Sequence, residues 1–241
     1  MTLPVPPEGM RALVGRPGLE EFLEPPDYWE STPARVLDLG CGCGRVGRWL
    51  LSTSRPERYV GIDLHAGMIE WCQANLAAPG FEYVHQDVVS PRLNPNGSLS
   101  VAPVPDGTYD LVLAVSFFTH TIEEHVGFYL DEVVRVLAPE GIFFSTWFLF
   151  DKIGFPMMQD FQNALYINPG DPTNAVIYDR GWLLRELSER GLVVRHAKVP
   201  EIRGFHWHLR VGRARPGETH AVLGPDEAPA GRRPPPVVSY T

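Results

Sequence analysis

The most constraining feature of the sequence is a stretch in which glycine recurs at every second position, Asp38-Leu39-Gly40-Cys41-Gly42-Cys43-Gly44. An apolar run over residues 36–39 predicts a short buried strand, and residues 45–51 can continue as a helix. Glycine tolerates unusual backbone angles, and because it lacks a Cβ atom a ligand can approach backbone N–H groups at the start of a helix. The stretch therefore predicts a strand–turn–helix unit that binds a ligand at the turn.

Apolar strand patterns alternate with helical patterns along the rest of the chain. Strands are predicted at residues 59–64, 81–87, 109–115, 142–150, 192–199 and 205–211, and helices at 66–78, 123–137 and 181–190. This alternation predicts an α/β fold with a parallel sheet covered by helices on both faces. Right-handed crossovers place the carboxyl ends of the strands at one edge, so Asp38, Asp63, Asp87 and Ser116 are expected to meet there.

The remaining segments define the expected domain organisation. Residues 1–33 are rich in proline with apolar residues at helical spacing, which predicts a helical cap, and residues 34–212 form the main domain. Residues 90–108 are predicted to be a loop and Pro139-Glu140-Gly141 a turn. Residues 151–179 break the alternation and are expected to cover the substrate, although a segment that only shields the sheet is the alternative. Residues 213–241 predict a loosely ordered Pro/Gly/Arg-rich tail.

Composition excludes several classes of protein. The formal net charge of −8 disfavours nucleic acid as the main partner, because binding to phosphates requires lysine and arginine. Three cysteines do not make a disulfide framework, and no apolar stretch is long enough to span a bilayer. The N-terminal residues lack the pattern of a signal peptide. We therefore expect a cytoplasmic protein that binds neither membranes nor nucleic acid, and a homodimer is compatible with this expectation.

Two interpretations of the glycine stretch compete. Residues 42–47 satisfy G-x-G-x-x-G, and Asp63 follows about twenty residues later, as a dinucleotide site of an NAD(P)-dependent oxidoreductase requires. Alternatively, Asp38-x-Gly40-x-Gly42-x-Gly44 resembles the first motif of class I S-adenosylmethionine-dependent methyltransferases. Further stretches resemble later motifs of that family: Gly61-Ile62-Asp63, Gln86-Asp87-Val88, Tyr109-Asp110-Leu111-Val112 and residues 135–141, where Glu140 replaces a usual glycine. Because several spaced motifs agree, the methyltransferase interpretation is preferred.

The resemblance implies a Rossmann-like, seven-stranded, mostly parallel sheet with an antiparallel last strand. It also implies S-adenosylmethionine as the cofactor and S-adenosylhomocysteine as its product. Asp63 would accept both ribose hydroxyls, Asp38 would meet the amino group, and Asp87 would receive the adenine amino group. The alternative for these acids is that they cap the following helices. The full set of expected cofactor-binding residues is Asp38, Gly40, Gly42, Gly44, Arg45, Asp63, Leu64, Met68, Asp87, Val88 and Ser116.

The acceptor is expected beside the stretch Ser116-Phe117-Phe118-Thr119-His120. This stretch resembles a bacterial branch of small-molecule methyltransferases, some of which act on sugars. His120 is the expected general base, with Glu123 or His125 orienting or replacing it, although His120 as a helix cap or packing residue is equally compatible with the sequence. The spacing of these three residues matches no zinc signature, so no metal is expected.

A saccharide or other small hydroxyl compound is the predicted acceptor, methylated on oxygen. The candidates to line its pocket are Phe117, Trp147, Tyr166, His206 and His208; for Trp147 and Tyr166 the default is packing in the core or the cover, and a wall that stacks on the substrate is the sharper alternative. The Asn/Asp-Pro-Pro-Tyr/Phe motif of enzymes that methylate amino groups in nucleic acids is absent after residue 115. A third hypothesis is a non-catalytic, methyltransferase-like partner subunit.

Overall fold

The computed structural model describes residues 6, 34–53, 55–155, 157–168, 170–200 and 206–223. The predicted cap at residues 1–33, apart from Pro6, and the part of the predicted tail beyond residue 223 lie outside the described residues. In the described part of the chain, no helix has the length and apolar character needed to cross a membrane.

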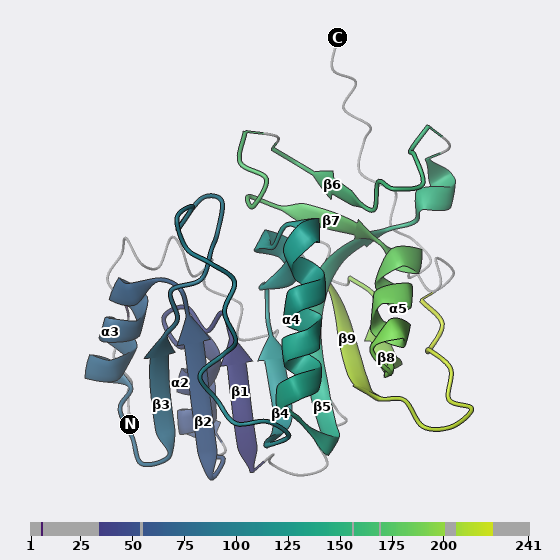
Figure 1. Cartoon of the computed structure of the whole chain (residues 1–241). Helices are drawn as coiled ribbons and strands as arrows, with labels where there is room; N and C mark the ends of the chain where they lie inside the picture. The colour runs from purple at the N-terminus through teal and green to yellow at the C-terminus, as the bar shows by residue number, and fades with distance from the viewer. Residues whose placement is uncertain are drawn as a thin grey trace.

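From β1 to β5 the described strands alternate with helices, except that β3 leads through a loop directly to β4 (Figure 1). In chain order they are β1 Arg35–Leu39, α2 Arg45–Thr53, β2 Arg58–Asp63, α3 Ala66–Asn75, β3 Phe81–His85, β4 Tyr109–Ala114, η2 Phe118–His120, α4 Glu123–Val136, β5 Leu137–Phe150, η3 Lys152–Gly154, β6 Ala164–Tyr166, β7 Val176–Asp179, α5 Arg180–Glu189, β8 Leu192–Lys198 and β9 His206–Arg213. Most predicted elements are found within a few residues of their expected bounds.

The sheet confirms the predicted fold class. Strands β3, β2, β1, β4 and β5 are neighbours in that order and run parallel. The last strand, β9, pairs antiparallel with β5, and β8 pairs antiparallel with β9. These are the seven strands that the resemblance implied, with the last one reversed.

Two additional strands come from the predicted insertion at residues 151–179. Phe148 of β5 pairs with His206 of β9 and also with Ile177 of β7, so β7 lies on the side of β5 opposite to β9. That is the side of β4, whose pairing with β5 ends at Ala114. Strand β6 pairs antiparallel with β7, and together they form a ribbon above the upper ends of β4 and α4 (Figure 1). The sheet therefore has nine strands.

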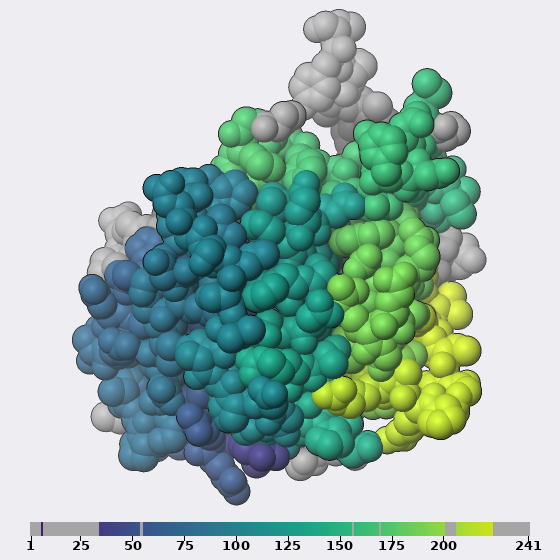
Figure 2. Space-filling view, in the orientation of Figure 1, coloured from purple at the N-terminus to yellow at the C-terminus, as the bar shows by residue number. Residues whose placement is uncertain are grey.

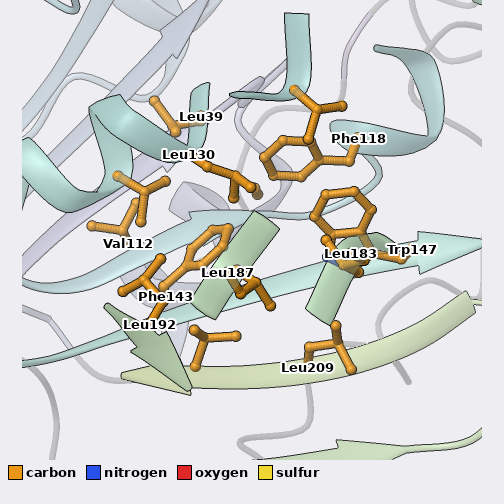
Figure 3. Packing of buried hydrophobic residues seen from close by; sticks show 14 of the residues in the cluster. Leu39, Val112, Phe118, Leu130, Phe143, Trp147, Leu183, Leu187, Leu192 and Leu209 are labelled. Atoms are coloured by element: carbon orange, nitrogen blue, oxygen red, sulfur yellow. The ribbon is translucent and has the colours of Figure 1, made fainter. Parts of the chain in front are cut away.

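Two apolar clusters hold the helices on opposite faces of the sheet. Leu37 and Leu39 of β1 belong to the cluster that includes residues of α4 and α5, whereas Val36 belongs to the cluster with α2 and α3. This division follows from the period of two along a strand. Figure 3 shows the first cluster, in which Phe118, Phe143 and Trp147 pack with leucines of α4 and α5.

The predicted turn at residues 139–141 is wrong, because β5 already begins at Leu137. The pairing partners change from Tyr109 and Leu137 to Leu111 and Ile142, so β5 advances five residues while β4 advances two. The irregular stretch is thus accommodated within the strand as a bulge. The loop predicted at residues 90–108 is ordered against α4, where Arg135 donates to the carbonyl oxygens of Ala102 and Val104.

Candidate cofactor and acceptor site

The glycine turn connects β1 to α2. Gly40, Gly42 and Gly44 have φ angles of +71°, +55° and +67°, a region that favours glycine. A Cβ atom on Gly40 would lie 2.8 Å from the Phe117 ring, and one on Gly44 would lie 2.6 Å from Leu76 Cδ1. For Gly42, the one neighbour within 4 Å among the described residues is Met68 Sδ at 3.9 Å. Gly42 is therefore the position of the turn that a ligand can approach.

Asp63 ties the end of β2 to this turn. Its Oδ2 atom accepts a hydrogen bond from Gly42 N at 2.8 Å, and its Oδ1 atom accepts one from His65 N at 2.8 Å. A carboxylate oxygen has two lone pairs, so each oxygen retains capacity to accept a further bond. The cap of α3 is His65, whose ring accepts from Met68 N, rather than Asp63 itself.

Asp38 lies below the turn and is almost fully buried, with 1% of its surface exposed. Its Oδ2 atom accepts a hydrogen bond from Tyr59 Oη at 2.7 Å. Burial raises the pKa of Asp38 to about 7, and the negative charge of Asp63 acts in the same direction. The hydrogen bond from Tyr59 and the positive charge of Arg45 lower this pKa but do not cancel the effect of burial. Burial also lowers the pKa of Arg45, which the charge of Asp38 partly offsets. Asp38 is thus a buried acid that an approaching cation would ionise.

The expected adenine side contains both apolar and polar residues. Met68 and Val88 are buried and Leu64 is half-buried. Asp87 is exposed and accepts a hydrogen bond from Asn94 Nδ2 at 2.6 Å. The same Asn94 nitrogen donates to the Val88 carbonyl oxygen, so Asp87 is anchored to the loop that follows β3.

The segment after β4 holds an unusual backbone conformation. Ser116 has a φ angle of +57° and is the one described residue other than glycine with a positive φ. Its N–H donates to Thr146 Oγ1 of β5 at 2.7 Å. Non-glycine residues in this region cost free energy and cluster at functional sites, where surrounding contacts hold them in place. The turn directs Phe117 over Gly40 and starts η2.

His120 ends η2 and is exposed. Its Nδ1 atom lies 2.9 Å from the carbonyl oxygen of Thr173, in the insertion. A carbonyl oxygen only accepts, so Nδ1 carries the proton in this contact and Nε2 retains its lone pair.

Glu123 and His125 do not pair with His120 in the described part of the chain. Glu123 Oε1 accepts from Asn163 Nδ2 at 2.8 Å, and Glu123 N donates to Tyr166 Oη at 3.2 Å. Both contacts join the start of α4 to the insertion. Burial lowers the pKa of His125, which disfavours its charged form. The residue that orients the His120 ring is therefore Thr173.

Trp147 is not part of an acceptor pocket, which corrects the prediction from sequence. It is 1% exposed, stacks on Phe118 with ring centroids 4.1 Å apart, and donates from Nε1 to Ser145 Oγ. Strand alternation points it into the cluster with α4 and α5 (Figure 3). His206 and His208 pair with Phe148 and Thr146, the neighbours of Trp147 along β5, and so lie on the opposite face.

The other residues expected in the acceptor pocket lie in two different places. Phe117 and Tyr166 are half-buried beside the glycine turn and the start of α4. The His206 ring packs against Phe148 with centroids 4.5 Å apart, and His208 packs edge-on against Phe144. Burial lowers the pKa of His206 to about 4, and the charges of His208, His120 and Arg45 act in the same direction. His206 thus lies within electrostatic range of the residues at the strand ends.

Comparison with known proteins identifies the domain. Residues 37–145 match the model of a family described as a methyltransferase domain. The chain is 34% identical over 112 residues to the fatty-acid O-methyltransferase of Mycolicibacterium smegmatis, an alignment that covers 46% of this chain and 36% of that protein. It is 33% identical over 117 residues to phthiotriol/phenolphthiotriol dimycocerosates methyltransferase 1 of Mycobacterium ulcerans, covering 48% and 38%. Residues 37–145 therefore have the sequence of a methyltransferase domain, and the sheet has the class I methyltransferase fold.

Solved structures share the fold of this methyltransferase domain. A SAM-dependent methyltransferase of Leishmania major superimposes with a TM-score of 0.55 at 18% identity, over 73% of this chain and 63% of that one. A 1,6-didemethyltoxoflavin-N1-methyltransferase of Burkholderia thailandensis, solved with bound S-adenosylhomocysteine, gives a TM-score of 0.51 at 20% identity, over 76% and 71%. These similarities show the fold alone, and the chain spans little more than a third of the length of the two curated relatives.

Three contacts of the methyltransferase domain were not anticipated from the sequence. They are the bonds from Tyr59 to Asp38, from Ser116 to Thr146 and from His120 to Thr173. Strand alternation places Tyr59 and Asp38 on the same face, which is a usable signal for the first pair. Nothing local marks the other two. The described residues hold no group of three or more His, Cys, Asp or Glu side chains arranged to bind a metal.

Proposed function

We propose that this protein transfers the methyl group of S-adenosylmethionine to an oxygen atom of a small-molecule acceptor. The observation that carries the cofactor half of the proposal is the bond between Asp63 and Gly42 N, which places a carboxylate beside the open glycine of the turn. Two relatives have names that state methyl transfer, and one of them is an O-methyltransferase, which supports oxygen as the accepting atom.

The residues at the turn fit the parts of this cofactor. Asp63 has lone pairs for the two ribose hydroxyls, and charge-assisted bonds of this type are stronger than neutral ones. Gly42 admits the methionine part close to the backbone, and Asp38 would receive the cationic amino group. Met68 and Val88 offer apolar surface to the adenine. When bound, the cofactor supplies a methyl group already activated by its positively charged sulfur.

His120 would accept the proton of the acceptor hydroxyl. Thr173 O accepts from Nδ1 and leaves Nε2 of the neutral ring available, so that Nε2 could accept the proton as a general base. Ser116 and Thr146 would hold the start of the segment, so that η2 presents His120 at the strand ends. The remaining task of the protein is to align the acceptor oxygen with the methyl group.

The competing hypotheses predict different ligands. An NAD(P)-dependent oxidoreductase would bind a dinucleotide at the same turn, and a non-catalytic partner subunit would transfer no methyl group. The family match over residues 37–145 favours the methyltransferase. A saccharide acceptor loses the support of Trp147, which packs in the core and offers no face for stacking on a sugar.

Calorimetric titration with S-adenosylhomocysteine, NAD and NADP tests the proposal. We expect binding of S-adenosylhomocysteine alone. Binding of a dinucleotide without S-adenosylhomocysteine would replace the proposal by the oxidoreductase. A screen of acids, alcohols and phenols with labelled S-adenosylmethionine then tests transfer to oxygen.

A further inference from the structure

Exposed apolar side chains concentrate in the first part of the insertion. Eight large apolar residues of the described chain are strongly exposed, and five of them lie between residues 153 and 167: Ile153 90%, Phe155 48%, Met157 88%, Phe161 77% and Ile167 60%. Single exposed apolar residues are ordinary, but such a concentration in one segment marks an interaction surface. We name these five residues the apolar rim.

The apolar rim belongs to the segment that crosses above the carboxyl ends of the strands. Figure 1 shows β6 and β7 above α4, and in Figure 2 the green atoms of this part of the chain form part of the upper surface of the molecule. Phe155 packs edge-on against Phe150, the last residue of β5, with ring centroids 5.4 Å apart.

The same segment is joined directly to the proposed reaction site. Tyr166 Oη accepts from Glu123 N, and Asn163 Nδ2 donates to Glu123 Oε1. Further along, Thr173 O contacts the His120 ring. The loop after β3 also reaches the insertion, through an ion pair between Arg92 and Asp171 at 3.4 Å. The segment that carries the apolar rim is therefore bonded both to the start of α4 and to His120.

Two charged side chains beside the apolar rim, Lys152 and Asp151, are bonded within the protein. Lys152 Nζ donates to the Asp160 carbonyl oxygen at 2.8 Å, and Asp151 pairs with Arg180 at 2.8 Å. With a net charge of −8 and no basic cluster on this segment, the surface does not suit an anionic membrane. Its chemistry suits an uncharged hydrocarbon chain.

We propose that the apolar rim binds the hydrocarbon chain of an amphiphilic acceptor whose oxygen-bearing end reaches His120. This inference rests on the proposed function for the reacting end and adds the substrate class. The acceptor is then a long-chain alcohol, whose hydroxyl proton His120 would accept, or a long-chain acid, whose carboxylate has no proton to lose and would need His120 only for positioning, rather than a saccharide. Each methylene buried on the rim contributes on the order of a fourfold increase in affinity.

The test separates chain binding from methyl transfer. Binding of cis-parinaric acid, a fluorescent 18-carbon fatty acid, is titrated on the full chain, on the double variant Ile153→Ser/Phe161→Ser and on the control Val101→Ser. Val101 is 60% exposed and lies next to Ala102, which bonds to Glu132 in the last turns of α4, away from the insertion. We expect the double variant to bind at least tenfold more weakly and the control to match the wild type. Equal binding by all three proteins, or no binding, overturns the inference.

Two parallel measurements test the proposed function and membrane binding separately from chain binding. Calorimetry with S-adenosylhomocysteine on the same proteins tests the proposed function. If the wild type does not bind S-adenosylhomocysteine, the methyltransferase proposal fails, whereas the parinaric acid titration still tests whether the apolar rim binds a hydrocarbon chain. Sedimentation with phosphatidylcholine vesicles judges membrane docking. Vesicle binding that the double variant loses, together with unchanged parinaric acid binding, would overturn the inference in favour of a membrane surface.

Discussion

The Nδ1 atom of His120 lies 2.9 Å from the carbonyl oxygen of Thr173, although 53 positions separate the two residues in the chain. This contact joins η2, at the end of β4, to the insertion that covers the strand ends. It fixes the ring so that Nε2 carries the lone pair. The proposed base and the cover of the site are therefore parts of one structural unit.

Replacing His120 by alanine tests this unit. We expect turnover to fall by about 10²- to 10⁴-fold, the usual contribution of a general base, with unchanged affinity for S-adenosylhomocysteine. Steady-state kinetics with an accepted substrate give the first value and calorimetry the second. His196→Ala, an exposed histidine on β8, is the matched control. Unaltered turnover of the His120 variant would remove His120 from the proposed role.

Replacing Asp63 by alanine tests cofactor binding. The variant loses a charged acceptor at the ribose position, and hydrogen bonds to charged groups contribute about 1.5–3 kcal/mol, so we expect roughly tenfold to hundredfold weaker binding of S-adenosylhomocysteine. Calorimetry measures the change. The variant also loses the bonds to Gly42 and His65, so its unfolding midpoint is measured beside the wild type. Wild-type affinity in a folded Asp63→Ala variant would contradict the assignment.

Asp38 predicts a pH dependence of stability. Its pKa of about 7 in the folded protein lies above the value of about 3.9 expected in the unfolded chain. The folded state therefore binds the proton more tightly, and the stability contributed by protonated Asp38 is lost as pH rises from about 4 through about 7. We expect Asp38→Asn to gain stability relative to the wild type between pH 5 and pH 7.5, measured by urea unfolding. A constant difference across this range would show that Asp38 is ionised throughout.

Alanine substitutions at Gly44 and Gly42 are expected to affect stability and cofactor binding differently. Alanine at Gly44 would adopt an unfavourable φ angle and place its Cβ atom 2.6 Å from Leu76, so we expect a loss of at least about 2 kcal/mol of stability. Alanine at Gly42 would meet no close neighbour among the described residues, so it should lose only the roughly 1–2 kcal/mol of stability that a positive φ angle costs a residue with a Cβ atom. Its methyl group would enter the space proposed for the cofactor. We expect Gly42→Ala to lose affinity for S-adenosylhomocysteine well beyond its loss of stability. Denaturant unfolding and calorimetry on both variants give the comparison, and similar effects on both properties would contradict it.

Sequence reasoning predicted the parts of the fold that local patterns control. The glycines at alternate positions form the predicted turn after β1, and their φ angles are positive, which glycine adopts readily. Asp38, Asp63 and Asp87 lie in or just after the last residues of parallel strands because right-handed crossovers align those strands. Along β1, residues one position apart pack against different helices, because successive side chains of a strand point to opposite faces.

The sequence by itself therefore determined the strand–turn–helix unit, the parallel sheet and the edge at which the site forms, because periodicity and backbone sterics act over a few residues. Only the tertiary structure decided that Trp147 packs against Phe118, that Tyr59 bonds Asp38, and that Thr173 orients His120. These pairs join segments distant in the chain, and their geometry depends on strand register and on how the insertion folds back over β4. No local preference encodes those distances, because they result from the packing of the whole domain.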